Sequence, residues 1–249
     1  MKQIPNLITL SNLFLGTVSI VFSFQEELSI AAMLIFVAAV FDFLDGFAAR
    51  LLKAYSDIGK ELDSLADLVS FGLAPAVILH QLMVSNIPPM AFLAFIGNEP
   101  DFWTNAGWYA MLLFPFILTL FSAYRLARFN VDTRQTESFI GLPTPASGLL
   151  IASFPLILAS ANCPDWLQEL LVSSSFILPF VAIISYLLVS PLPLMSLKFK
   201  SVRWKENAWR FILIAFSLIS MIVFKWMAVP IIWLGYIVIS LLNVTFAKE

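Results

Sequence analysis

The sequence is poor in the residues on which many structural and catalytic sites depend. It contains one cysteine, Cys163, and one histidine, His80, in 249 residues. A single cysteine excludes an internal disulfide and a multi-cysteine metal site. Charged residues make up only 12% of the chain, and the net charge of -2 provides no broad basic surface of the kind that binds nucleic acid. We expect both Cys163 and His80 to have structural roles.

Apolar residues, in contrast, are abundant. Hydrophobic residues form 60% of the chain and include 24 phenylalanines, which is more than a soluble core of this size can bury. Because a bilayer core of about 30 Å needs roughly 20 apolar residues per helix, we expect an all-α membrane protein with about eight spans. The expected spans lie near residues 5–24, 28–53, 62–84, 105–129, 144–161, 170–190, 207–225 and 227–247.

The basic residues predict the orientation of these spans, because cytoplasmic loops retain Lys and Arg. With the N-terminus inside, Lys225 is the one basic residue that falls outside, and the expected outer loops carry acids instead: Glu26, Glu27, Glu99, Asp101, Asp165 and Glu169. Both termini are therefore predicted to be cytoplasmic. We expect the protein to lie in the inner membrane. We expect a main membrane domain over 1–190, followed over 191–249 by a basic interfacial linker and two additional spans.

Four aspartates interrupt the apolar sequence of the second and third spans. Residues three, four and seven apart share one face of a helix. One such stripe contains Asp42, Asp45, Gly46, Ala49 and Arg50, and a second contains Gly59, Asp63 and Asp67. The short link over 51–58 makes these two helices antiparallel neighbours. We therefore expect the four carboxylates to converge on one cavity at the cytoplasmic side.

Four acids within a membrane cost on the order of 10 kcal/mol, so a compensating charge is needed. Carboxylate oxygens without His or Cys suit Mg²⁺, Mn²⁺ or Ca²⁺, and four of them can hold two such cations, an arrangement that supports phosphoryl chemistry. The small residues Gly46, Ala49 and Gly59 allow the helices to approach each other or to admit a flat ligand. A cation transporter that uses the acids as its ion site is the non-enzyme alternative.

The stretch from Asp42 to Asp67 resembles the signature of the CDP-alcohol phosphotransferase family, D-x2-D-G-x2-A-R-x8-G-x3-D-x3-D, at every fixed position. The resemblance implies that Asp42, Asp45, Asp63 and Asp67 bind two divalent cations and that Asp67 also acts as the general base. It implies a homodimer and contacts of the signature residues with the CDP-linked lipid. The expected lipid-binding residues are Pro5, Asn6, Leu7, Ile8, Gly46, Ala49, Arg50, Ser56 and Gly59.

The acceptor alcohol is less closely specified. The segments PNLITLSNLFLG, YRLARFN and FIGLPTPASG resemble the phosphatidylserine synthase branch of that family, which implies transfer from CDP-diacylglycerol to L-serine. Arg125 and Arg128 share a helix face, and a guanidinium suits the carboxylate of serine or a diphosphate oxygen. Anchoring by the positive-inside rule explains these arginines equally well.

Two other enzyme readings are open. Glycerol 3-phosphate or an inositol phosphate as the acceptor would favour a denser set of basic residues than Arg125 and Arg128 provide. A magnesium-dependent prenyltransferase would need a second acid-rich motif, and the acids after Asp67 are scattered. A cation transporter, for its part, does not explain the spacing of Gly46, Ala49, Arg50 and Gly59.

Overall fold

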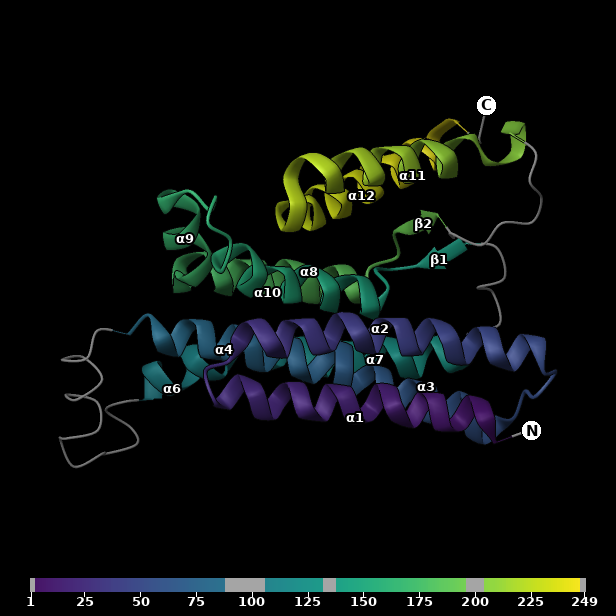
Figure 1. The fold of residues 1–249 in the computed structure, drawn as a ribbon, viewed down its shortest axis with the longest axis horizontal. Helices are drawn as coiled ribbons and strands as arrows, with labels where there is room; N and C mark the ends of the chain where they lie inside the picture. Colours follow the sequence, from purple (N-terminus) through teal and green to yellow (C-terminus); the bar gives the residue numbers. More distant parts are fainter. Residues whose placement is uncertain (1–2, 88–105, 132–137, 196–203, 247–249) are drawn as a thin grey trace.

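The computed structural model describes residues 3–87, 106–131, 138–195 and 204–246. The described chain is a bundle of helices with one short pair of strands (Figure 1). Its elements are α1 (Ile4–Phe24), α2 (Leu28–Leu51), α3 (Asp57–Asp67), the π-helical η1 (Leu68–Leu73), α4 (Ala74–Ser85), α6 (Ala106–Leu113), η2 (Phe114–Phe116), α7 (Ile117–Val131), β1 (Ser138–Ile140), α8 (Thr144–Leu158), α9 (Asp165–Val172), α10 (Ser174–Val189), β2 (Pro193–Met195), α11 (Trp204–Phe224), η3 (Lys225–Met227) and α12 (Ala228–Phe246).

Successive long helices run back and forth between the two ends of the bundle. The α1–α2 link, α9 and α6 lie at one end, whereas the strands and both chain termini lie at the other end (Figure 1). This arrangement agrees with the expectation that both termini face the same side of the membrane. The side of the membrane on which that end lies stays a prediction.

Five helical segments among the described residues are long and apolar enough to cross a bilayer, or six if α9 and α10 form one broken span. Ser173, which has extended backbone angles, separates α9 from α10, and the two helices are bent by 63°. The expected spans all correspond to helices, but α8 has only 15 residues, and α11 to α12 are counted within one apolar segment, Asn207–Leu242. The predicted number of eight spans is therefore not confirmed.

The core of the bundle forms around η1, which continues directly from α3. A Cβ atom on Gly16 of α1 would lie 2.7 Å from the Cα atom of Ser70, and one on Gly148 of α8 would lie 2.9 Å from the Cα atom of Phe71. Only glycine permits backbones to approach this closely. Two helices far apart in sequence therefore press against the segment that follows Asp67.

The two strands are an exception to the all-α expectation, and each is three residues long. β1 and β2 are antiparallel, with Ser138 opposite Met195. Gly141 follows β1 with a positive φ of 81°, and its N–H group donates to the Leu192 carbonyl oxygen at 2.9 Å. Backbone hydrogen bonds thus fasten the segment just before α8 to the chain that leaves α10.

Candidate active site

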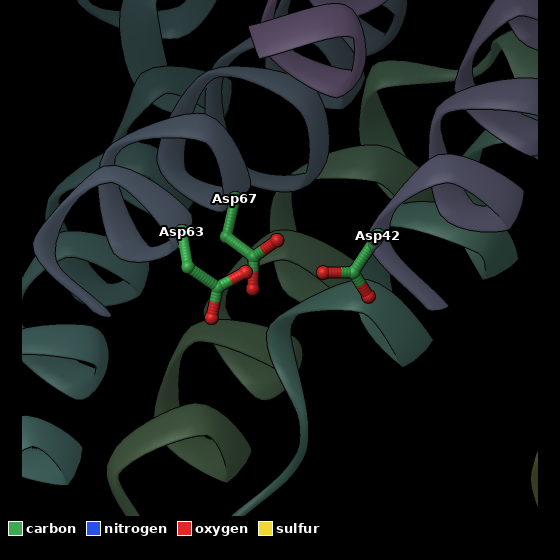
Figure 2. Close-up of side chains that lie close together, drawn as sticks. All are labelled: Asp42, Asp63 and Asp67. Atoms are coloured by element: carbon green, nitrogen blue, oxygen red, sulfur yellow. The ribbon is translucent and has the colours of Figure 1, made fainter. Parts of the chain in front are cut away.

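Three aspartates from two helices face one another near the end of the bundle that carries the strands. Figure 2 shows Asp42 of α2 opposite Asp63 and Asp67 of α3. Each offers one carboxylate oxygen, and these oxygens all lie within 4.8 Å of one another. Asp67 is 8% exposed, and its Oδ1 atom has no hydrogen-bond partner among the described residues. A buried carboxyl oxygen without a partner indicates a site for a cation or for a proton-donating ligand.

The local sequence explains how α3 presents its two acids. Ser56 is the N-cap residue of α3, and its hydroxyl accepts a 3.0 Å hydrogen bond from the Gly59 N–H group. Asp63 and Asp67 follow one and two turns after Gly59, so they share a face. The helix then changes to π geometry. π-Helices are rare in proteins, but those that occur are often found at functional sites. The capping role of Ser56 adds to its expected contact with the lipid substrate.

Asp45 lies beside the three-aspartate cluster, and its side chain is hydrogen-bonded to helix α1. Its Oδ2 atom accepts a 2.6 Å hydrogen bond from the Thr9 hydroxyl of α1, and its side chain is 6% exposed. The structure thus gathers three of the four expected carboxylates into one group. Asp45 instead faces α1, because Thr9 supplies a donor there.

Thr9 was missed by reasoning from the acidic motif alone, although the sequence contains a signal for it. Pro5, Thr9 and Asn12 belong to a row of buried proline, small and polar residues along α1. Their spacing of three and four residues marks one helix face. A row of small and polar side chains on an otherwise apolar helix predicts the face that contacts a polar neighbour.

The glycines of the signature occupy two different environments. A Cβ atom on Gly59 would lie 3.0 Å from Oδ1 of Asn6, so α1 and α3 approach closely at this point. A Cβ atom on Gly46 would meet only Nη1 of Arg50, at 3.6 Å, among the described atoms. Gly59 therefore serves helix packing, whereas Gly46 leaves open space next to Asp42 and Asp45.

The other expected lipid-binding residues differ in their exposure. Arg50 and Ser56 are exposed, and Ala49 is partly buried. In α1, Pro5 is buried, Asn6 and Ile8 are partly buried, and Leu7 is 61% exposed. Leu7 therefore lies on the outer face of the first turn, unlike Pro5.

Arg125 of α7 contributes a buried positive charge to the site. It is 8% exposed, and its Nη1 atom donates a 3.0 Å hydrogen bond to the Thr144 hydroxyl at the start of α8. Its Nε atom has no partner among the described residues. The guanidinium lies within electrostatic range of Asp67, so its positive charge partly balances the acidic cluster.

The structure separates Arg128 from Arg125. Nη1 of Arg128 points to the Val189 carbonyl oxygen at the end of α10, at 3.5 Å. Nearby, the side-chain amide of Asn130 donates to the Ser64 hydroxyl at 2.9 Å. The backbone carbonyl oxygen of Asn130 accepts a hydrogen bond from Lys60 Nζ at 2.7 Å. Arg128 and Asn130 thus connect helices, whereas Arg125 is the buried arginine within electrostatic range of Asp67.

The donor atoms of the cluster fit a hard divalent cation. Asp42, Asp63 and Asp67 offer only carboxylate oxygens, which are the ligands that Mg²⁺, Mn²⁺ and Ca²⁺ prefer. Their close spacing requires neutralisation in a membrane, and Arg125 supplies one positive charge. His80 takes no part, since its Nδ1 atom lies 2.8 Å from the Leu112 carbonyl oxygen.

Comparison with known proteins places this site in a family context. The family model described as CDP-alcohol phosphatidyltransferase matches residues 2–188. That range includes all four aspartates and Arg125, and it ends before β2, α11 and α12. The matched region therefore holds the whole acidic cluster.

Several curated relatives carry the name CDP-diacylglycerol–serine O-phosphatidyltransferase. The protein from Bacillus subtilis is 35% identical over 168 residues, which are 66% of this chain and 84% of the relative. The protein from Helicobacter pylori is 32% identical over 217 residues, or 86% of this chain and 80% of the relative. An archaetidylserine synthase from Methanothermobacter thermautotrophicus is 34% identical over 155 residues, 61% of this chain and 58% of the relative.

Proposed function

Because the chain belongs to the CDP-alcohol phosphatidyltransferase family, we propose that it transfers the phosphatidyl group of CDP-diacylglycerol to the hydroxyl of L-serine. The products are phosphatidylserine and CMP. The relatives named as serine transferases support this choice of acceptor. The observation that carries the proposal is the placement of Asp67, a buried carboxylate that belongs to the acidic cluster and also interacts with Arg125.

The acidic residues prepare the site for an anionic substrate. Asp42, Asp63 and Asp67, with Asp45 beside them, would hold two divalent cations, which neutralise the diphosphate and make its phosphorus more electrophilic. Thr9 fixes the carboxylate of Asp45 by the 2.6 Å hydrogen bond. Held in this way, Asp45 contributes its charge at a constant position.

Asp67 acts as the general base. Its buried Oδ1 atom accepts the proton of the serine hydroxyl as the serine oxygen forms a bond to the β-phosphorus, the one attached to the lipid. The bond from this phosphorus to the oxygen bridging the two phosphates breaks, and CMP leaves with that electron pair. Direct displacement needs no phosphorylated residue on the protein.

Arg125 binds the carboxylate of serine. Its guanidinium keeps free donor capacity at Nε, while Nη1 is held by Thr144. A planar guanidinium with a fixed orientation recognises a carboxylate through paired hydrogen bonds. Since Arg125 also interacts with Asp67, the serine carboxylate and hydroxyl would be bound at neighbouring points.

The nucleotide lipid occupies the open space next to Gly46. Arg50, whose Nη1 atom lies nearest to this space, would contact the lipid there. By family resemblance, Ser56, Pro5 and Asn6 would contribute further contacts. We place this site at the cytoplasmic face of the inner membrane, because Lys and Arg concentrate at that end of the predicted spans. By family resemblance, the protein works as a homodimer.

The experiment that tests this function measures CMP release by the purified protein with CDP-diacylglycerol, Mg²⁺ or Mn²⁺, and one alcohol at a time. We expect release with L-serine and little with glycerol 3-phosphate or inositol phosphate. Release with glycerol 3-phosphate but not with serine would overturn the choice of acceptor. No release with any alcohol would overturn the transferase proposal and favour the cation-transporter alternative.

A further inference from the structure

The last helix of the described chain reaches the active site although it lies outside the region that the family model matches. Helix α12 packs against β2 and α8 (Figure 1). Its Tyr236 side chain is 8% exposed, and the hydroxyl donates a 3.0 Å hydrogen bond to the Met195 carbonyl oxygen of β2. The phenol also lies near the Arg125 guanidinium. A residue beyond the matched range 2–188 thus binds the strand pair next to the site and lies near its buried arginine.

Tyr236 belongs to a polar stripe on an apolar helix. Trp233, Tyr236 and Ser240 are spaced by three and four residues, so they share one face of α12. Tyr236 and Ser240 are buried, and Trp233 Nε1 has no hydrogen-bond partner among the described residues. A helix that only filled space in a membrane would carry apolar residues on this face.

A series of hydrogen bonds and short chain segments leads from Tyr236 to Arg125. Met195, which accepts the tyrosine hydrogen bond, is paired with Ser138 of β1. Three residues after Ser138, the Gly141 N–H group donates to the Leu192 carbonyl oxygen. This hydrogen bond holds the start of α8 in place. Thr144, the first residue of α8, is the hydrogen-bond partner of Arg125. Tyr236 therefore contacts the strand pair that precedes the residue holding the arginine.

We propose that Tyr236 is a positioning residue for the acceptor half of the site, which holds β2 and β1 so that Thr144 orients Arg125 toward the bound alcohol. This inference rests on the proposed role of Arg125 in binding the acceptor. It gives the C-terminal helix pair a function in acceptor selection. The nucleotide half of the site, built from α1, α2 and α3, is independent of this contact.

The first test is the substitution Tyr236→Phe, which removes the hydroxyl and keeps the ring. Kinetics are measured with the alcohol that supports CMP release by the unaltered protein, so a wrong choice of acceptor does not prevent the test. We expect the KM for that alcohol to rise about five-fold, as for the loss of one hydrogen bond. The KM for CDP-diacylglycerol should not change. Tyr186→Phe is the matched control, because Tyr186 is 63% exposed on α10.

The second test combines Tyr236→Phe with Thr144→Ala in a double-mutant cycle. If Tyr236 acts through Thr144, the double variant should have the acceptor KM of Thr144→Ala alone. Multiplicative effects on the acceptor KM would overturn the proposal, and so would equal increases in the KM values of both substrates. A Tyr236→Phe protein that fails to fold would assign the residue to stability alone and would also overturn it.

Discussion

The hydroxyl of Thr9 lies 2.6 Å from a carboxylate oxygen of Asp45, and this contact joins α1 to α2 beside the acidic cluster. Both side chains are buried, at 3% and 6% exposure. The hydrogen bond fixes Asp45, the one aspartate of the four that lies outside the cluster of the other three. It also brings the start of α1, with its expected nucleotide-binding residues, to the edge of the site.

Replacing Thr9 by valine should weaken catalysis through Asp45. The substitution keeps the shape of the side chain and removes the donor, and hydrogen bonds to charged groups contribute about 1.5 to 3 kcal/mol. We expect kcat/KM for CDP-diacylglycerol to fall roughly ten- to hundredfold in a CMP-release assay. Thr17→Val is the control, since among the described residues the Thr17 hydroxyl bonds only to the Leu13 carbonyl oxygen within α1. Equal activity of the two variants would contradict the role of Thr9.

Replacing Gly46 by alanine should interfere with the nucleotide lipid without disturbing the fold. A Cβ atom there meets only Arg50 Nη1, at 3.6 Å, among the described atoms, so the protein itself has room for it. We expect a higher KM for CDP-diacylglycerol with an unchanged or slightly higher melting temperature, because alanine favours helix by about 1 kcal/mol. Gly107→Ala on α6, where the described residues also leave space, should leave the KM unaltered. An unchanged KM in Gly46→Ala would show that the lipid does not enter this space.

Replacing Gly16 by alanine should destabilise the bundle. The added Cβ atom would lie 2.7 Å from the Cα atom of Ser70 in η1, and a backbone atom cannot move aside as a side chain does. Overpacking of this kind costs about 1 to 3 kcal/mol. The melting temperature in detergent should therefore fall clearly below that of the Gly107→Ala protein. Equal melting temperatures would contradict the close approach of α1 to η1.

The orientation in the membrane can be tested with introduced cysteines, because the chain has one native cysteine. Cys163 is 7% exposed, and burial raises the pKa of its thiol, so a Cys163→Ser background removes a slowly reacting group. In that background, Gln25→Cys should react with a membrane-impermeant maleimide added to intact cells. Tyr55→Cys, at the other end of the bundle, should react only after lysis. The reverse pattern would place the active site on the outer face.

The sequence allowed the helices and the acidic stripe to be predicted, because both depend on local patterns. Hydropathy indicates each long helix, and a spacing of three or four residues places Asp63 and Asp67 on one face. The same periodicity placed Arg125 and Arg128 together. The structure separates them, because side chains as long as arginine reach different partners from neighbouring turns. Helix periodicity therefore predicts a shared face and does not predict a shared contact.

The features that could not be predicted depend on contacts between distant segments. Thr9 and Asp45 are 36 residues apart, and Tyr236 and Met195 are 41 residues apart. The π-helical turn after Asp67 has no strong local propensity in its sequence LVSFGL; it occurs where Gly16 and Gly148 bring two other helices against it. Such contacts follow from the packing of the whole bundle, for which a single sequence carries little direct information.

The most direct test of the account follows labelled serine into lipid with the unaltered protein and with Asp67→Asn. The unaltered protein should convert serine to a chloroform-soluble phospholipid, dependent on CDP-diacylglycerol, with one CMP released per lipid formed. Asp67→Asn should bind the nucleotide lipid and form no product, because the amide cannot accept the proton of the serine hydroxyl. Product formation by Asp67→Asn at the normal rate would contradict the assignment of Asp67 as the base.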